Sequence, residues 1–473
     1  MDGRNRTTVG QRWVLSLASL GALMVALDAL VVAAALSSIK GDLGASIEQL
    51  EWTVNAYSLS FAMWLMVGAA LGERWGRRRM FAAGLGLFSV ASVACALAPS
   101  IEWLITARAV QGIGAAFVMP LAIGLIGAAF PPERRGWATG VFSGLTGVGV
   151  LAGPVVGGAV TQGLAWQWIF WINVPVGAVA VTCVLLRISE SRGAARPVDL
   201  PGVALISLAV LGIVWGVVRG ASAGWSSAEV IGSLSVGGLV LLAFLVWESR
   251  ARQPMVPLSF FRSRTFSAGN AAAFFLTAAL FGAVFFMTQY MQTAFSSGPL
   301  EAGLRLLPWT GTLFLVSPLA GRLVDRVGER PLVAGGLTLQ AAGMFWISLV
   351  SADAPHYVNL VPPLILAGCG VSMALPATQS ATIGALPRES VGLASGVYSM
   401  MRQLGGAVGV AVLAAAFTSA GGYGSFPTGF TRAFAASGVL SLLGAASGLC
   451  VSVRHGGEPG ASVARPEPVK ELR

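Results

Sequence analysis

The sequence predicts an all-α, polytopic membrane protein with fourteen transmembrane helices, built as two pseudo-symmetric six-helix bundles plus two linker helices. Of the 473 residues, 55% are hydrophobic and only 11% are charged, whereas a soluble domain carries about a quarter charged residues. Fourteen apolar runs are long enough to cross a hydrocarbon core of about 30 Å. In addition, two pairs of segments match each other at a nearly constant spacing, which indicates an internal duplication.

The apolar runs are continuous rather than alternating, which favours helices over the strands of a membrane barrel. In chain order, the expected spans are 13–37, 52–72, 80–98, 102–130, 136–161, 167–187, 201–219, 229–248, 266–291, 303–321, 332–351, 358–386, 392–418 and 432–453. They divide the chain into a cytoplasmic N-terminus (1–12), an N-terminal six-helix bundle (13–187), two inserted helices with flanking loops (188–265), a C-terminal six-helix bundle (266–453) and a disordered cytoplasmic tail (454–473).

The basic residues support this topology. With both termini in the cytoplasm, 24 of the 30 Lys and Arg residues lie on the cytoplasmic side, and only Lys40, Arg219 and Arg432 lie outside, as the positive-inside rule requires. The net charge of +10 is therefore spread over short loops, which favours a cell-membrane location over a nucleic-acid-binding face. The four cysteines all fall inside apolar spans and predict neither a disulfide nor a metal site.

The matching segments lie in equivalent loops and helices. LGERWGRRR (71–79) matches GRLVDRVGER (321–330) at an offset of 252 residues, and GWATGVFS (136–143) matches GLASGVYS (392–399) at an offset of 256. Each copy therefore holds six helices, with the seventh and eighth spans inserted between the copies. Parallel repeats with a binding site at the midplane between them are typical of transporters.

Asp28 is the only acidic residue in the middle of an apolar, membrane-length run, GALMVALDALVVAAAL. A charge at that depth costs about 2.5–3.5 kcal/mol on insertion scales, and such residues are usually functional. We therefore expect Asp28 to exchange protons and to act as the counter-charge for a cationic substrate; the alternative is a carboxyl held by a structural partner. Arg108, inside the fourth span, needs an anion or several carbonyl groups, or it snorkels to the outer interface.

Several motifs, in the right order, resemble those of the major facilitator superfamily, and more narrowly its fourteen-helix drug:proton antiporter branch. The matching segments are the two loop motifs above, LDALVV (27–32), LITARAVQGIGAA (104–116), GVGVLAGPVVGG (147–158), WQWIFWINVPVG (166–177), FFRSRTF (260–266) and AGLRLLP (302–308). The chain departs from the pattern at Ala69, where Gly is usual, and at Glu73, which replaces Asp. The first-helix motif also lacks its usual Asn and Pro.

The resemblance implies roles for three groups of residues. Asp28 and Arg108 would couple transport to protons, with the proton gradient as the energy source and no cofactor. The loop residues would gate the cytoplasmic helix ends, beyond setting topology: Glu73, Arg74, Gly76, Arg77, Gly321, Asp325, Arg326 and Gly328. Small residues and a proline would let the fifth span pack closely and move as a unit, beyond ordinary glycine packing: Gly147, Gly149, Gly153, Pro154, Gly157 and Gly158. The implied partners are the lipid bilayer, protons and a small lipophilic substrate, with the chain working as a monomer and without nucleic acid.

Polar and aromatic residues in other spans could line a substrate cavity, although each alone is better explained as a helix–helix hydrogen bond. Gln111 lies three residues after Arg108 and shares its helix face. The other candidates are Asn55, Tyr57, Gln289, Tyr290, Gln292, Gln379 and Gln403.

Three kinds of function compete. The scarcity of polar groups across the spans favours a proton-driven exporter of lipophilic, including cationic, drugs or natural-product antibiotics. A dedicated exporter of one self-made metabolite, or a symporter for uptake, stays an alternative. An enzyme is disfavoured because GASAG (220–224) matches a nucleophile motif outside its structural context and the only histidines are His356 and His455. The sequence also lacks H-E-x-x-H and Walker A motifs.

Overall fold

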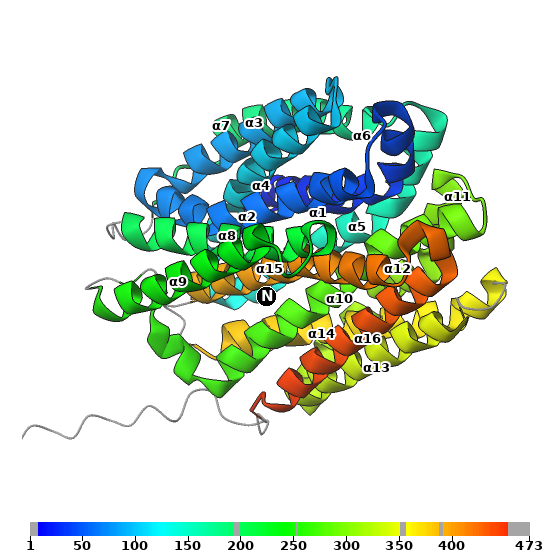
Figure 1. Ribbon diagram of the computed structural model, residues 1–473. Coiled ribbons are helices and arrows are strands. Elements are labelled where there is room, and N and C mark those ends of the chain that lie inside the picture. Colours follow the sequence, from blue (N-terminus) through cyan, green and yellow to red (C-terminus); the bar gives the residue numbers. More distant parts are fainter. Residues whose placement is uncertain are drawn as a thin grey trace, which may run out of the picture.

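The computed structural model describes residues 8–192, 199–251, 254, 256–350, 356–386 and 391–452, so the predicted tail at 454–473 lies outside the described residues. Within these ranges the secondary structure is helical and contains no strand (Figure 1). The first half contains α1 (Val9–Leu43), α2 (Ile47–Trp75), α3 (Arg77–Ala96), α4 (Ile101–Ala129), α5 (Pro132–Gly163), α6 (Trp168–Trp171) and α7 (Asn173–Arg187). The linker helices are α8 (Leu200–Ala223) and α9 (Ala228–Arg250), followed by η1 (Leu258–Arg262). The second half contains α10 (Arg264–Ala294), α11 (Pro299–Arg305), α12 (Leu307–Val327), α13 (Glu329–Val350), α14 (Tyr357–Gly384), α15 (Val391–Ser419), η3 (Gly422–Ser425) and α16 (Phe426–Leu449).

The first two helices begin earlier than the hydropathy pattern predicts because polar residues cap them. Thr8 caps α1 and Ser46 caps α2, each through a reciprocal capping box with a glutamine three residues later. As a result α2 begins at Ile47 rather than at 52. Glu51, which the predicted span leaves out, therefore lies inside the helix, where only 5% of its surface is exposed.

The two halves repeat one another in how their helices pack. α1 packs on α5 as α10 packs on α15, and α2 packs on α4 as α12 packs on α14. α3 contacts α4 and α7, and α13 correspondingly contacts α14 and α16. In Figure 1 the blue helices of the first half lie above the yellow and red helices of the second. α15 packs on α2, and α5 packs on α11, so each half contributes to the boundary between them.

A close helix crossing shows the repeat at the level of atoms. A Cβ atom added at Gly112 in α4 would lie 2.3 Å from the carbonyl oxygen of Tyr57 in α2. A Cβ atom added at Gly368 in α14 would lie 2.4 Å from the carbonyl oxygen of Trp309 in α12. These pairs are related by the same offsets of 256 and 252 residues that relate the sequence motifs. Helix backbones can approach this closely only where the residue between them is small.

The linker helices α8 and α9 pack on each other, and α8 contacts both α2 and α15. The ring centroids of Trp52 in α2 and Trp215 in α8 lie 5.1 Å apart. The Ser207 hydroxyl of α8 donates a hydrogen bond of 3.1 Å to the carbonyl oxygen of Met63 in α2. The linker is thus fixed to the first half while it also contacts the second.

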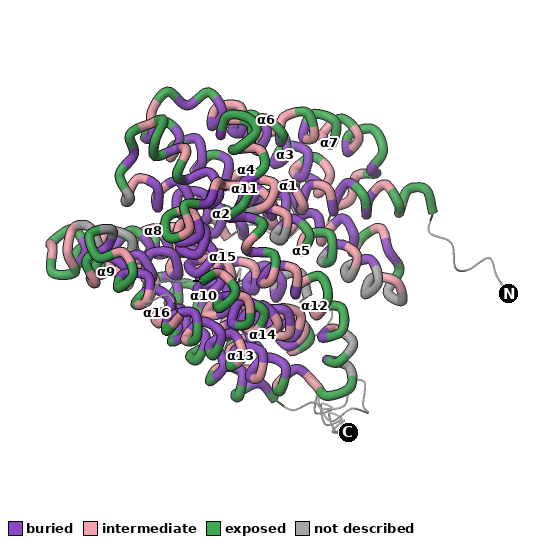
Figure 2. Tube along the Cα trace, turned by 90° about the vertical axis from the view of Figure 1, so that its right-hand side faces the viewer, coloured by how far each residue is buried: buried purple, intermediate pink, exposed green. Residues whose placement is uncertain are grey.

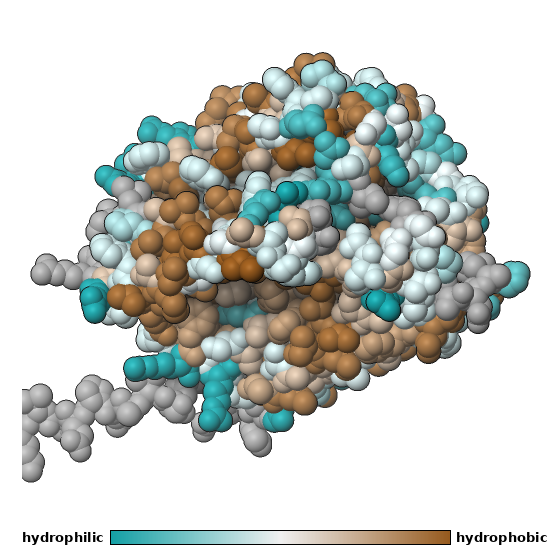
Figure 3. All heavy atoms as spheres, in the orientation of Figure 1, coloured by the Kyte–Doolittle hydropathy of each residue, from teal (hydrophilic) through white to brown (hydrophobic). Residues whose placement is uncertain are grey.

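The outer surface of the bundle is apolar, as expected of a membrane protein. Leu186, Leu349 and other large hydrophobic side chains are more than two-thirds exposed (75% and 73% for these two), and hydrophobic atoms spread over much of the face in Figure 3. Figure 2 shows exposed residues around the outside of the bundle and buried ones where the helices meet. The structure thus confirms an all-helical membrane fold.

The number of membrane crossings is supported in part. Ten of the described helices are long and apolar enough to cross a membrane, or eleven if the bent segments Glu48–Leu65 and Val67–Trp75 of α2 form one span. A helix overlaps each of the fourteen predicted ranges, although the ranges 167–187 and 303–321 are each interrupted, at Ile172 and Leu306. The count of fourteen crossings therefore stays a prediction.

Candidate functional site

Asp28 and Arg108 lie together in the interior of the first half, and neither side chain has any exposed surface. Arg108 Nη1 donates a hydrogen bond to Asp28 Oδ2, which makes the two an ion pair. The other carboxylate oxygen, Oδ1, accepts hydrogen bonds from Gln111 Nε2 at 2.9 Å and from Asn173 Nδ2 at 3.0 Å. Three helices, α4, α7 and α1, therefore meet at one carboxylate.

The Arg108 guanidinium has further partners on α2 and α4. Its Nε donates to the carbonyl oxygen of Thr53 at 3.1 Å, and Nη1 also donates to Gln111 Oε1 at 2.6 Å. Its central carbon lies 4.1 Å from the centroid of the Tyr57 ring, a cation–π arrangement. Tyr57 in turn donates to the carbonyl oxygen of Val25 at 3.2 Å. Arg108 Nη2 has no hydrogen-bond partner among the described residues.

This geometry corrects one alternative and leaves another open. Arg108 does not snorkel to the outer interface, because it is fully buried and its charge is paired with Asp28. An ion pair without water is held only when its geometry and surrounding hydrogen bonds are good, and removal of one partner leaves a buried, uncompensated charge. The same network can serve as a structural pair or as a proton-exchanging pair. Chemically, protonation of Asp28 would remove the charge that holds Arg108.

Three side chains of the network were not among the predicted site residues: Asn173, Ser92 and Cys95, whose Sγ lies 3.6 Å from Gln111 Oε1. Asn173 is the first residue of α7, and Ser92 in α3 accepts a hydrogen bond of 2.9 Å from Gln111 Nε2. Asn173 is 2% exposed and Ser92 has no exposed surface. The signal for Asn173 is present in WQWIFWINVPVG, where an amide interrupts an otherwise apolar run. Ser92 carries no comparable signal, since serines are frequent in these spans.

Among its described residues, the second half shows no counterpart of this network. Gly149 in α5 approaches the carbonyl oxygen of Leu23 in α1, and its repeat equivalent Gly405 in α15 approaches that of Phe274 in α10. This alignment makes Ala279 the repeat equivalent of Asp28, because each lies five residues after the aligned residue of its helix, Phe274 or Leu23. At the offset of 256, Arg108 corresponds to Leu364 and Gln111 corresponds to Ala367. The three residues of the second half, Ala279, Leu364 and Ala367, are apolar and fully buried. The positions equivalent to the charged pair of the first half are thus apolar in the second half, although other buried polar side chains, such as Gln340 and Ser372, lie there.

The glycines of the predicted antiporter helix bring α5 close to α1, the helix that carries Asp28. Cβ atoms added at Gly149, Gly153 and Gly157 would lie 2.9, 2.9 and 2.6 Å from atoms of α1, and one added at Gly158 would lie 2.2 Å from the carbonyl oxygen of Pro299 in α11. Gly147 has no neighbour within 4 Å of such a Cβ atom. Pro154 lies within α5, but its side chain is outside the described part of the structure.

We predict that Gly157→Ala destabilises the protein and lowers transport, whereas Gly147→Ala on the same helix does neither. The added methyl at 157 would meet the carbonyl oxygen of Val31, and overpacking of this kind costs about 1–3 kcal/mol. Thermal unfolding of the two purified variants checks the prediction, and equal melting temperatures would contradict it.

The predicted gating residues are arranged around two loops. Glu73 accepts two hydrogen bonds of 2.8 Å from Arg77, whose Nη1 also donates to the carbonyl oxygen of Gly124 at 3.2 Å, so the ends of α2, α3 and α4 are joined. Gly76 and Gly328 adopt φ values of 112° and 81°, which L side chains rarely do. Arg74 and Arg326 are exposed, Gly321 has no close neighbour, and the side chain of Asp325 lies outside the described part of the chain.

Glu190, which follows α7, also belongs to the first loop, although the sequence did not single it out. Its Oε1 accepts a hydrogen bond of 3.0 Å from the backbone N–H of Arg78, and its carboxylate lies within 3.7 Å of the Arg78 and Arg79 guanidinium groups. A Cβ atom at Gly76 would lie 2.5 Å from this carboxylate. The loop motif therefore needs glycine at 76 both for its backbone angle and for space.

The remaining predicted cavity residues do not join the Asp28 network. Tyr290 packs in an aromatic cluster between α10 and α16, 5.0 Å from the ring centroid of Phe430. Gln292 Nε2 donates to the carbonyl oxygen of Ala34 at 3.2 Å and so links the two halves. Asn55 is fully buried, and neither of its amide atoms has a hydrogen-bond partner among the described residues. Gln289, Gln379 and Gln403 are half-buried.

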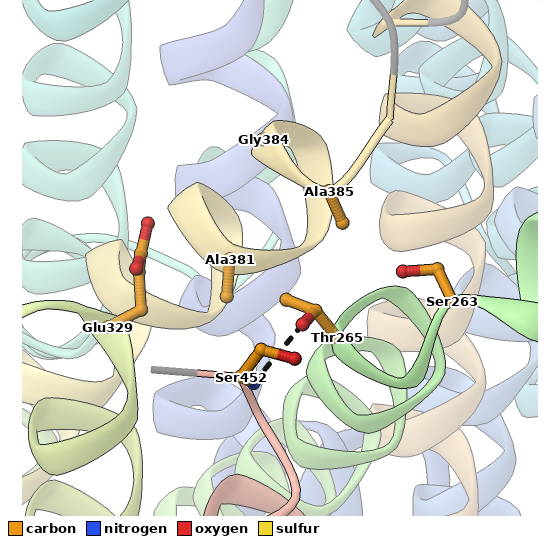
Figure 4. A pocket seen from close by; sticks show the side chains of 7 residues that line it. All are labelled: Ser263, Thr265, Glu329, Ala381, Gly384, Ala385 and Ser452. Carbon is orange, nitrogen blue, oxygen red and sulfur yellow. Dashed lines mark hydrogen bonds between the residues drawn. The ribbon is translucent and has the colours of Figure 1, made fainter. Parts of the chain in front are cut away.

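A separate polar pocket of about 210 Å³ lies at helix ends of the second half (Figure 4). Glu329 lies on its rim and accepts a hydrogen bond of 3.1 Å from Ser380 of α14. The backbone N–H of Ser452 donates to Thr265 Oγ1 at 3.2 Å, which ties the residue after α16 to α10. None of the predicted site residues lines this pocket, so it is not part of the Asp28 site.

Solved structures of transporters resemble this fold. A peptide transporter POT in complex with sulfate matches with a TM-score of 0.67 at 17% identity, covering 92% of this chain and 93% of that chain. A POT family transporter in complex with 5-aminolevulinic acid matches with a TM-score of 0.70 at 14% identity, covering 91% and 94%. At such low identity the likeness establishes the fold alone.

Similar proteins carry the names of resistance proteins. The tetracenomycin C resistance and export protein of Streptomyces glaucescens is 34% identical over 85% of this chain and 76% of its own length. The multidrug resistance protein Stp of Mycobacterium tuberculosis is 34% identical over 86% and 76%, and the puromycin resistance protein pur8 of Streptomyces alboniger is 35% identical over 86% and 82%. The model of the Major Facilitator Superfamily matches residues 18–249 and 269–473. The chain therefore belongs to the major facilitator superfamily of multi-pass membrane transporters.

Proposed function

We propose that this chain is a proton-coupled antiporter that exports lipophilic, including cationic, drugs or natural-product antibiotics by alternating access. The observation that carries the proposal is the fully buried pair of Asp28 and Arg108, held by Gln111 and Asn173. Relatives named for resistance to tetracenomycin C, puromycin and several drugs support efflux as the direction of transport. We further propose the fourteen-helix topology, a location in the cell membrane with both termini in the cytoplasm, and a working monomer.

In this mechanism Asp28 accepts and releases the proton that drives export. While Asp28 is ionised, Arg108, Gln111 and Asn173 neutralise and orient it. A proton that reaches Asp28 releases the Arg108 guanidinium, because a neutral carboxyl no longer compensates the positive charge. Inward movement of one proton releases about 2.3 kcal/mol per 100 mV of membrane potential, which would drive uphill efflux.

Alternating access requires contacts between the halves that form in one state and break in another. At the predicted outer end, Gln292 of α10 binds the carbonyl oxygen of Ala34 in α1. At the same end, Gln162 Oε1 of α5 accepts a hydrogen bond of 3.3 Å from the backbone N–H of Leu300 in α11. We assign these as outer contacts that open when substrate is released. At the opposite end the Glu73–Arg77 pair joins α2 to α3 within the first half.

A narrower function is favoured by one observation. Relatives include proteins named for resistance to single antibiotics, such as tetracenomycin C, puromycin and methylenomycin A. A dedicated exporter of one self-made metabolite is therefore the second candidate. A proton-driven symporter for uptake has no such support.

The test is transport into inverted membrane vesicles that contain the protein. Respiration acidifies these vesicles, so an antiporter accumulates puromycin or ethidium inside them, and a protonophore abolishes the accumulation. Accumulation that survives the protonophore would exclude proton coupling. Failure to accumulate any of a panel of lipophilic cations and neutral antibiotics would point to the dedicated exporter or to uptake.

A further inference from the structure

Glu51 is a second buried carboxyl in the first half, and the Asp28 network does not use it. It lies one turn into α2 and is 5% exposed. Neither a hydrogen bond nor an ion pair connects Glu51 to another of the described residues. Asn55, one helical turn further, is fully buried, and both its amide nitrogen and its amide oxygen lack partners within the described ranges. Buried polar groups are nearly always paired, so two such groups on adjacent turns require an explanation.

The two side chains share a face of α2 that is not used by its other contacts. Trp52 packs on a tryptophan of α8, whereas Gly112 of α4 lies against Tyr57 and Ser60 of α2. Because Glu51 and Asn55 are four residues apart, they project from one side of the helix, next to the side that faces α8 and away from α4.

α15 of the second half occupies this side, since it packs on both α2 and α8. Figures 1 and 2 both draw α2, α8 and α15 side by side. The unpaired groups therefore lie at the boundary between the halves, where alternating access would admit a substrate.

We infer that Glu51 and Asn55 form a binding site for the positively charged nitrogen of a lipophilic amine or iminium substrate. A carboxylate supplies the charge, and the amide oxygen of Asn55 supplies an acceptor for an N–H group. Leu59 and Ala62, four and seven residues after Asn55, lie on the same side of α2, are buried, and suit the lipophilic body of such a ligand. The inference rests on the proposed export function and assigns its cationic substrates a binding site separate from Asp28.

The site differs from the proton-coupling pair in its location and in its partners. Both carboxylate oxygens of Asp28 accept hydrogen bonds, from Arg108, Gln111 and Asn173. The Glu51 carboxyl accepts none from the described residues and can bind a ligand. A substrate cation at Glu51 would therefore not need to compete with Arg108. Substrates without a positive charge would gain nothing from Glu51, so this residue should separate cationic from neutral substrates.

The experiment compares ethidium, a lipophilic cation with N–H groups, with chloramphenicol, which is uncharged. Ethidium binding to the purified full-length protein is measured by fluorescence polarisation, and resistance to both compounds is measured in an efflux-deficient host. For Glu51→Gln we expect ethidium binding to weaken about tenfold or more, as loss of one charge contact implies, while chloramphenicol resistance stays at the wild-type level. Asn55→Ala should weaken ethidium binding less, and Glu51→Asp should restore part of it.

Glu48→Gln is the matched control, because Glu48 lies on the same helix but is partly exposed and already paired with Arg219. Unchanged ethidium binding in Glu51→Gln, or an equal loss for both compounds, would overturn the inference. The same holds if the wild type binds no ethidium. A wild-type protein that confers resistance to neither compound, and accumulates no drug in vesicles, would instead remove the proposed export function.

Discussion

Asp28→Asn is expected to abolish drug resistance in an efflux-deficient host, down to the level of cells that carry an empty vector. Asn has nearly the same shape as Asp, but it can neither carry a charge nor release a proton. The Arg108 guanidinium would then lie in the interior without its counter-charge. Because both proton exchange and the balance of charge depend on this carboxylate, the loss should extend to all substrates, cationic and neutral.

The measurement is growth inhibition by a panel of lipophilic cations, neutral antibiotics and dyes at matched expression. Asn173→Ala is an informative companion, since it removes one hydrogen bond to Asp28 and leaves the charge pair in place. It should reduce resistance without eliminating it. If Asp28→Asn retained resistance, Asp28 would be excluded as the coupling residue, and the acids of the loops and Arg108 would need to be examined.

Arg108→Leu is expected to have the second large effect, on stability as well as on transport. The variant leaves Asp28 buried without its cation, and breaking a buried pair in this way costs about 3–5 kcal/mol. We expect a lower melting temperature and no resistance.

The second half of the same protein suggests how to separate the two effects. It carries Ala279 and Leu364 at the positions equivalent to Asp28 and Arg108. The double variant Asp28→Ala/Arg108→Leu copies this apolar arrangement, so it should regain most of the lost stability, since replacing both members of a buried ion pair is often nearly neutral. It should remain inactive. A double variant as unstable as Arg108→Leu alone would show that the cost does not arise from the unpaired charge.

The sequence is sufficient to predict the helical membrane fold and its duplication. Hydropathy locates the helices because the bilayer imposes a length of apolar chain, and the offsets of 252 and 256 residues reappear as equivalent crossings at Gly112 and Gly368. The breaks at Ile172 and Leu306 were not predicted from hydropathy, because one or two residues change the mean of a span very little. Pro175 and Pro308 follow the breaks within three residues, and proline cannot donate a hydrogen bond to the preceding helical turn. The start of α2 was misplaced for a different reason: a capping box can extend a helix over polar residues that the apolar pattern excludes.

The candidate site could be predicted only in part. Asp28 and Arg108 stand out because charges are rare in apolar runs, but their contact joins residues 80 positions apart and depends on how α1 and α4 pack. Asn173, 145 positions from Asp28, is recognised only once α7 is placed. Glu51 was missed because burial depends on the neighbouring helices as well as on the local sequence. Tyr290, a predicted cavity residue, packs in an aromatic cluster, and its place in a substrate cavity stays a prediction.

The most direct test of the central claim is whether substrate binding releases a proton from Asp28. The purified protein is kept in a weakly buffered detergent solution with a pH indicator, and a transported drug is added. The account predicts that the wild type releases protons on binding and that Asp28→Asn, if it still binds the drug, releases none. A wild type that binds drug without proton release, or a variant that releases as many protons as the wild type, would contradict the claim that protons and substrate exchange through Asp28.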